Sequence, residues 1–278
     1  MKKKPHIDVN PVTTTTVGAQ GLRPLLDSLT PPPIVDPNLP RRPAQLKTLP
    51  RPDFLEAQLP EGHIALITDD GSLTTSKVVH ALIEQGWKVV VLSFPQSLVP
   101  EQLPLPASVT RVTLANMSEQ HLQLLLQSVT TKHGPIGAFI HLHPQFTPEK
   151  PGHISYPEAE KAILKQVFLM AKHLKATLNN AASLPGRTSF CTVAHLDGEF
   201  GLGHQGNFSA IAAGLFGLIK SLRWEWPQVF FRAIDLNPSL DHHESAQYIV
   251  AELHDSNRYI GEVGYGNQGR VTLVAKAE

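Results

Sequence analysis

Beyond His63, hydrophobic residues form short continuous runs that alternate with longer segments of helical periodicity. Apolar runs of about four to eight residues are typical of strands buried on both faces of a parallel sheet. The runs that predict such strands are 64–67, 89–92, 109–114, 136–142, 188–193 and 229–236, and two short segments, 259–263 and 270–274, predict the last two strands. The intervening periodicity predicts helices over 78–83, 118–126, 156–178, 209–224 and 244–254.

Strands that alternate with helices along a chain build a parallel sheet with helices on both faces. Two local signals support the helix ends, because Gly86 follows the first helical segment and Ser118 precedes the second. The pattern predicts an α/β domain over residues 61–278. We expect a doubly wound, mostly parallel sheet of the Rossmann type.

Proline dominates the part of the chain before this domain. Twelve of the 24 prolines lie in residues 1–60, where they keep the backbone extended and remove hydrogen-bond donors. Residues 1–60 are therefore predicted to be a Pro-rich interdomain linker. One apolar segment in it, 22–29, is predicted to form a helical turn or to dock on a neighbour. A linker of this length also suggests that another domain precedes it.

Charge and composition narrow the class of protein. The chain has 24 basic and 24 acidic side chains and therefore no net charge. This argues against binding to nucleic acid or to an anionic membrane through an overall positive charge. No apolar run reaches the roughly 18–20 residues that span a bilayer, and no apolar signal-peptide core follows the basic residues 2–4. A single cysteine, Cys191, predicts a reducing compartment. We expect a cytoplasmic protein.

Histidine is plentiful, with 14 residues, and two close pairs are candidate metal ligands. His141 and His143 lie two apart in an apolar run, and His242 is followed directly by His243. A metal site needs several converging ligands and a supporting second shell. Neither pair has a Cys, His or Asp neighbour at a metal-binding spacing, so we expect no metal site.

The turn after the first strand of the predicted domain is the first candidate cofactor site. A dinucleotide needs glycines there, because the backbone must turn tightly and approach the pyrophosphate closely. The turn, residues 68–74, has only Gly71, and two carboxylates, Asp69 and Asp70, lie where a diphosphate would bind. Like charges repel, so this turn predicts no cofactor binding.

A second candidate is the segment 201–206, in which Gly201, Gly203 and Gly206 match the pattern G-x-G-x-x-G. The segment follows a predicted strand and precedes a helix. However, the strand ends near Val193, which leaves several residues before the first glycine, and Asp235 lies further on than the usual acid about 20 residues away. A flexible glycine-rich loop is the favoured interpretation, with a cofactor loop as the alternative.

The order of elements resembles the short-chain dehydrogenases/reductases. In that family a serine follows the fifth strand, and Tyr-x-x-x-Lys lies on the next helix, where tyrosine is the general acid and lysine lowers its pKa. Aligning residues 212–218 with the small-residue segment of the family places Asn207 at the tyrosine and Ile211 at the lysine. Residues 193–195 cover the serine region. The resemblance therefore implies a truncated or degenerate Rossmann fold without catalytic residues.

Two further segments, 214–227 and 231–236, resemble the ketoreductases of type I polyketide synthases, with Lys220 in place of the usual arginine. Those ketoreductases have two Rossmann-like halves: the first is structural, and the second binds NADPH and catalyses the reduction. This chain resembles the first half, and 258–274 resembles the segment that leads into the second. Within that group, residues 59–71 and the linker resemble the polyunsaturated fatty acid synthases of marine bacteria.

The resemblance implies a noncatalytic half of a β-ketoacyl-acyl carrier protein reductase region, with no catalytic, cofactor-binding or metal residues of its own. Its implied partners are an NADPH-binding catalytic half, the neighbouring synthase domains and an acyl carrier protein.

Two other functions stay open. A self-contained reductase would hold its cofactor on Gly201, Gly203 and Gly206, with His195 or His204 as proton donor. A free-standing interaction domain would use the degenerate fold as a scaffold. Two groups of residues belong either to the core or to an interface. They are the small residues of 210–214 and the pair Trp224 and Trp226.

Overall fold

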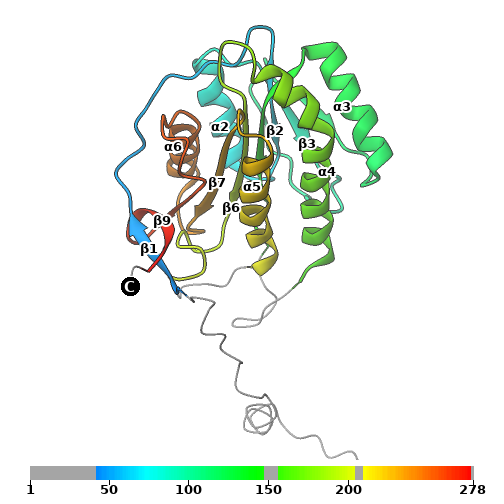
Figure 1. Cartoon of the computed structure of the whole chain (residues 1–278). Helices are drawn as coiled ribbons and strands as arrows, with labels where there is room; N and C mark the ends of the chain where they lie inside the picture. Colours follow the sequence, from blue (N-terminus) through cyan, green and yellow to red (C-terminus); the bar gives the residue numbers. More distant parts are fainter. Residues whose placement is uncertain (1–41, 147–155, 204–208, 277–278) are drawn as a thin grey trace, which may run out of the picture. The chain divides into compact units, whose positions relative to one another are not determined.

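The computed structural model describes residues 42–146, 156–203 and 209–276, and all its helices and strands lie in the unit of residues 44–278 (Figure 1). Within those ranges, nine strands form one sheet in the order β1-β9-β8-β7-β6-β5-β2-β3-β4. The strands are β1 (Ala44–Thr48), β2 (Ile64–Thr68), β3 (Val89–Ser93), β4 (Thr110–Thr113), β5 (Ile136–Leu142), β6 (Ser189–Ala194), β7 (Phe230–Leu236), β8 (Glu262–Gly266) and β9 (Gly269–Ala275). The helices are α2 (Leu73–Glu84), α3 (Glu119–His133), α4 (Glu158–Ala181), the 3-10 helix η1 (Ala210–Ala213), α5 (Gly214–Glu225) and α6 (His242–Leu253).

The strands from β4 to β8 run parallel to their neighbours. The chain moves outward from β2 through β3 and β4, and then returns to place β5 on the other side of β2. This reversal is the topological switch point of a doubly wound fold, and such folds bind ligands outside the carboxyl ends of the strands there. The predicted fold class is confirmed.

Burial on both faces explains why the strands are continuous apolar runs. β2, β3, β5, β6 and β7 are buried along their whole lengths. One face is covered by α3, α4 and α5, with a core that includes Leu66, Val167 and Ile219 (Figure 1). The other face is covered by α2 and α6, with a core that includes Ile67 and Ile249. Adjacent strand residues point to opposite faces, so Leu66 and Ile67 stabilise different layers.

α4 is the longest helix of the described residues and is amphipathic. Its buried positions include Ile163, Val167 and Leu174, which recur at helical spacing and pack into the core. Neither α4 nor any other described helix combines the length and hydrophobicity needed to cross a membrane.

The crossover from β3 to β4 lacks the helix that usually joins parallel strands. Residues 94–109 contain neither helix nor strand. Four prolines lie in this segment, at positions 95, 100, 104 and 106, and each removes a backbone donor that a helix needs. The doubly wound fold is therefore truncated at this crossover.

The predicted strand 259–263 begins later than expected, since β8 covers Glu262–Gly266. The carbonyl groups just before β8 accept hydrogen bonds from arginine side chains. Arg223 donates to the carbonyls of Arg258 and Tyr259, and Arg232 donates to the carbonyl of Ile260. A backbone whose acceptors serve arginine side chains does not continue the ladder.

The sheet also extends beyond the predicted domain boundary at residue 60. β1 pairs antiparallel with β9, with Ala44 opposite Ala275 and Thr48 opposite Val271. Further along, the amide of Ala57 donates to His254 Nδ1 over 3.0 Å. Residues 44–48 contain no proline, so every amide is available for a ladder, but their partner strand lies more than 200 residues away. The predicted segment 22–29 lies outside the described residues.

A buried cluster of four charges, Arg232, Glu252, Asp255 and Arg270, ties β7, α6 and β9 together. Arg232 and Glu252 have no exposed surface. The distance from Arg232 Nε to Glu252 Oε2 is 3.1 Å, and Arg270 Nε lies 2.6 Å from Glu252 Oε1. Asp255 Oδ2 lies 3.1 Å from Arg232 Nη2 and 2.5 Å from Arg270 Nη2. Two cations and two anions balance, so no member is left uncompensated.

Replacing Arg232→Met is expected to lower the free energy of unfolding by about 3–5 kcal/mol, because two buried carboxylates then share one guanidinium. Urea unfolding followed by circular dichroism measures this. The matched control is Lys175→Ala, which removes an exposed ion pair with Glu225 and should cost less than about 1 kcal/mol. Equal effects of the two substitutions would contradict the assigned role of the cluster.

Candidate functional site

The candidate site is the edge of the sheet where β2 and β5 end, on either side of the switch point. β2 is followed by Asp69 and Asp70, and β5 contributes His141 and is followed by His143. All four side chains are buried. An open Rossmann crevice would hold a cofactor at this position, so the partners of these groups decide what the site can bind.

Asp70 lies just before α2 and holds its N-cap residue Ser72, whose own Oγ accepts from the amide of Thr74. Asp70 Oδ1 accepts from the amide of Ser72 over 2.9 Å and from the hydroxyl of Thr75 over 2.6 Å. Its Oδ2 accepts from the hydroxyl of Ser72 over 2.8 Å. A helix N-terminus attracts anions because its first amides lack partners and the helix dipole is positive there. The chain supplies its own anion to this position.

Asp69 uses the remaining polar groups around the turn. Its Oδ1 accepts from the amide of Gly71 over 3.0 Å. Its Oδ2 accepts from Ser93 Oγ and from Arg111 Nη2, each over 3.0 Å. The carboxylate therefore holds the turn to the end of β3 and to β4. The sequence indicated only repulsion between these acids and a diphosphate, whereas the structure assigns each acid a set of donors.

The Pro-rich crossover covers the same turn. A Cβ atom built on Gly71, whose φ is +80°, would lie 2.8 Å from Val99 Cγ1 and 3.1 Å from the carbonyl oxygen of Glu101. Space of this kind is what a glycine usually leaves for a pyrophosphate. Here the chain itself fills it, and the residues around the turn do not fit the diphosphate of a dinucleotide.

The second glycine segment is organised by Asp197. Its Oδ1 accepts from the amide of Gly201 over 2.8 Å, and its Oδ2 accepts from the amide of Gly203 over 3.0 Å. A Cβ atom on Gly203 would lie 2.7 Å from Glu199 Oε2. These glycines thus leave room for neighbouring carboxylates, and their amides already have acceptors. The third glycine, Gly206, lies outside the described residues, as do His204 and Asn207.

A chain of hydrogen bonds crosses the switch point from β2 to α4. Thr68 Oγ1 lies 2.8 Å from His141 Nδ1, His141 Nε2 lies 3.0 Å from His143 Nδ1, and His143 Nε2 lies 3.2 Å from Glu160 Oε1. If each ring carries a proton on Nε2, every donor along this chain points towards Glu160. Burial, together with the neighbouring His143, holds the pKa of His141 well below its usual range. Each histidine therefore provides a hydrogen-bond partner for a ring nitrogen of the other.

The structure also shows the surroundings of three other candidate histidines, His195, His242 and His243. Burial lowers the pKa of His195 to about 4, so its ring is neutral at pH 7 and is a poor proton donor. Its Nδ1 is buried without a hydrogen-bond partner among the described residues. His242 Nδ1 lies 2.9 Å from Thr74 Oγ1, and His243 bonds Gln247. In the described ranges, no group of three or more His, Cys, Asp or Glu side chains is arranged to hold a metal ion.

Two further positions, Ile211 and Cys191, lack a side chain suited to transferring a proton or acting as a nucleophile in a reductase site. Ile211 lies in η1, where its amide donates to the hydroxyl of Ser209, and its aliphatic side chain cannot hold a charge. Cys191 is buried in β6, and burial raises the pKa of its thiol to about 12, which makes it a poor nucleophile.

Asp235, at the end of β7, anchors the loop after β6. Its Oδ1 accepts from the amide of Leu196 and its Oδ2 from the amide of Phe200, each over 2.8 Å. Phe200 has a φ of 59°, which non-glycine residues rarely adopt and which surrounding contacts must hold. Burial raises the pKa of Asp235 to about 7, despite these two donors.

Sequence reasoning missed three of these groups. Asp197, Glu199 and Glu160 were not singled out, although an Asp followed by glycines is a frequent Asx-turn signal. The burial of Glu160, by contrast, depends on His143 reaching α4 from β5, and no local pattern indicates that contact.

The sequence matches no family model. It is 31% identical over 241 residues to a subunit of the polyunsaturated fatty acid synthase of Thraustochytrium sp. (strain ATCC 26185 / S-3), a match that covers 84% of this chain and 8% of that protein. This chain is thus a distant homologue of one segment of a far longer synthase protein.

Solved structures of oxidoreductases match a large part of the chain. A metagenomic short-chain oxidoreductase in complex with NADP has a TM-score of 0.55 and 17% identity, covering 73% of this chain and 96% of that one. The 3-ketoacyl-(acyl-carrier-protein) reductase from Brucella melitensis has a TM-score of 0.50 and 18% identity, covering 64% and 76%. This is the short-chain dehydrogenase/reductase fold. At such low identity the likeness extends to the fold alone.

Asp70→Ala is expected to lower the free energy of unfolding by about 1–2 kcal/mol, because the amide and hydroxyl of Ser72 and the hydroxyl of Thr75 lose their acceptor. Urea titration measures the loss. Glu61→Ala, an exposed site before β2, is the control and should change stability by less than about 0.5 kcal/mol. If Asp70→Ala behaves like the control, the carboxylate does not stabilise the turn.

Asp235 should also make the free energy of unfolding depend on pH. Because its pKa is about 7 in the folded protein, the folded chain keeps a proton that the unfolded chain loses near pH 4. Its contribution to stability is therefore full below about pH 4 and is lost as the pH rises through about 7. From about pH 5 to pH 8, the free energy of unfolding of the unmodified chain should fall relative to Asp235→Asn, by up to about 1.4 kcal/mol per pH unit. Parallel profiles would contradict the raised pKa.

Proposed function

We propose that this chain is the noncatalytic structural half of a β-ketoacyl reductase region in a synthase of the polyunsaturated fatty acid or polyketide type. The observation that carries the proposal is the use of Asp70 and Asp197 as internal anions. Each accepts backbone amides at one of two separate glycine-containing turns, Asp70 from Ser72 and Asp197 from Gly201 and Gly203, while the sheet around them keeps the reductase topology. A damaged enzyme would more simply lose one site.

In this proposal the chain packs on a catalytic half and holds it in its active shape. That half binds NADPH and reduces a β-ketoacyl group carried on acyl carrier protein, and other synthase domains flank the pair, with the Pro-rich residues before β1 linking the fold to them. The homology to one segment of a much longer synthase protein, 8% of its length, supports this setting. The single cysteine is in keeping with a reducing cytoplasm.

A self-contained reductase is the less favoured alternative. It would need a proton donor and a cofactor cradle. His195 is neutral at pH 7 because of its lowered pKa, and the amides of Gly201 and Gly203 are already bonded to Asp197. The described residues therefore favour the structural role.

The full chain is expected to show no NADPH binding in isothermal titration calorimetry and no NADPH oxidation with a β-ketoacyl thioester. Micromolar binding or measurable turnover by the chain alone would overturn the proposal. The positive arm expresses the ketoreductase half of the parent synthase with and without this chain. We expect a higher melting temperature and at least about tenfold more reductase activity with the chain, since half of the folded unit is then restored.

A further inference from the structure

Two aromatic side chains on this chain are almost entirely exposed. Trp224, in the last turn of α5, is 89% exposed, and Tyr259, in the segment before β8, is 90% exposed. Trp226 lies only two residues from Trp224 yet is buried, where it packs against Phe190 and Phe231. The tertiary structure thus separates a core tryptophan from a surface one. Tyrosine and tryptophan are enriched at protein interfaces relative to the rest of the protein surface.

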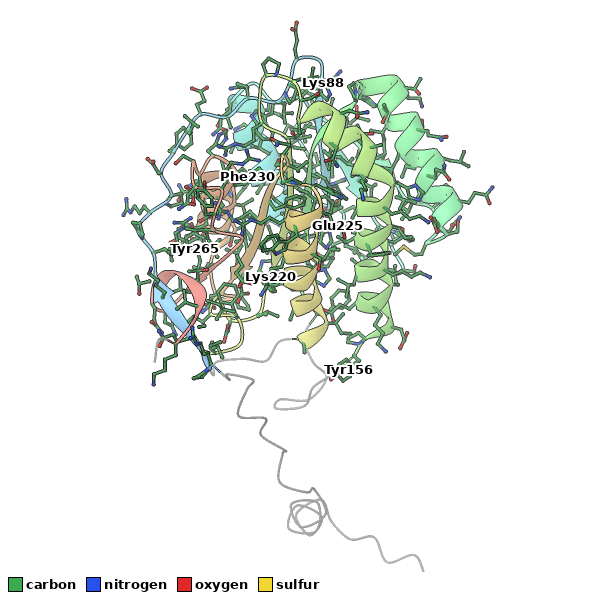
Figure 2. All side chains as sticks on the ribbon, in the orientation of Figure 1. Lys88, Tyr156, Lys220, Glu225, Phe230 and Tyr265 are labelled. Atoms are coloured by element: carbon green, nitrogen blue, oxygen red, sulfur yellow. The ribbon has the colours of Figure 1, made fainter. Side chains whose placement is uncertain are left out.

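Both exposed rings line one hollow of about 1040 Å³. Its walls come from the end of α5, the start of β7 and the segment 256–259. Figure 2 labels Lys220 on α5 and Phe230 at the start of β7, two residues that line it. The hollow lies away from Asp70 and Asp197, which are not among its lining residues, so it is separate from the degenerate cofactor edge.

The two arginines of the hollow are hydrogen-bonded to backbone carbonyls. Arg223 Nη2 donates to the carbonyls of Arg258 and Tyr259 over 2.9 and 2.7 Å. Arg258 Nη2 in turn donates to the carbonyl of Gln228 over 2.6 Å. A guanidinium has five N–H donors, so each arginine keeps others for a ligand. Carbonyl contacts fix the position of the group without neutralising its charge.

The charge of the hollow is unbalanced. Neither Arg223 nor Arg258 makes an ion pair within the described residues, whereas Lys220 pairs with Glu262 over 2.9 Å. Asp53 is the carboxylate among the lining residues, and it accepts from the hydroxyl of Ser256. Two fixed, unpaired guanidinium groups beside two exposed rings therefore present a cationic and apolar surface.

We propose that this surface, formed by Trp224, Tyr259, Arg223 and Arg258, binds an acidic segment of a protein partner that carries an apolar side chain. Tryptophan, tyrosine and arginine are the residues that dominate binding energy at protein interfaces. Because both arginines are already ordered, little side-chain entropy is lost when they bind carboxylates. The whole chain carries no net positive charge, which argues against the continuous phosphate backbone of a nucleic acid as the ligand.

The probe is a fluorescein-labelled helical peptide built from Glu, Leu and Ala, titrated with the full chain and followed by fluorescence anisotropy. We expect saturable binding that weakens with added salt. Trp224→Ala and Tyr259→Ala should each weaken binding by about tenfold or more. Both side chains are exposed, so the melting temperature should stay unchanged and a folding defect is distinguishable from a binding defect. Arg223→Gln and Arg258→Gln should weaken binding of the acidic peptide and reduce its salt dependence.

Matched controls separate this proposal from its rivals. Phe168→Ala removes another exposed ring, 59% exposed, which lines a different hollow with Leu164 and Leu218, and it should leave binding unchanged. Equal binding of a peptide with Gln in place of Glu, or no binding of the acidic peptide, would overturn the proposal. So would tighter binding of a single-stranded oligonucleotide. A concentration-dependent dimer in sedimentation that Trp224→Ala abolishes would overturn it too, and would assign the surface to a second copy of the chain.

Discussion

Every buried backbone donor at the carboxyl edge of a parallel sheet needs an acceptor, and among the described residues this chain supplies several from its own carboxylates. Asp70 accepts from the amide of Ser72 just before α2, Asp197 accepts from the amides of Gly201 and Gly203 after β6, and Asp235 accepts from the amides of Leu196 and Phe200 in the same loop. In an enzyme of this fold a cofactor phosphate meets part of that demand. Within the described residues, internal carboxylates take donors that a ligand could otherwise use, and this supports the proposed structural role.

The far edge of the sheet is stabilised by different chemistry. The buried charge cluster joins Arg232 on β7 to Glu252 on α6 and Arg270 on β9, and β1 then pairs with β9. Arg232 also donates to the carbonyl of Ile260, just before β8. The same arginine thus fixes the segment that carries Tyr259. The buried charge cluster therefore helps to position the exposed aromatic surface. That surface shares no lining residue with the cofactor edge.

Much of the fold was predictable from local pattern. The run 136–142 corresponds to β5 to the residue, and the other predicted strands and helices overlap the observed ones. Burial on both faces of the inner strands leaves continuous apolar runs. β4 was expected to be buried as well, but it lies at the edge of the sheet and is partly exposed. The strand predicted at 259–263 was misplaced, since arginine side chains take its carbonyls. β1 was missed because its partner strand lies at the other end of the chain. The single glycine after β2 predicts no cofactor binding at that turn, which stays a prediction, and it did not indicate which donors Asp70 would take.

The sequence by itself determined the α/β order of elements, the truncated crossover with its four prolines, and the poor glycine content of the first turn, because hydrophobic periodicity and backbone restrictions act between near neighbours. Only the tertiary structure decided that Trp226 is buried while Trp224 is exposed, that His141 and His143 bond each other and Glu160, and that Asp197 occupies the glycine amides. Those outcomes depend on which elements pack together, and packing joins residues that are distant along the chain.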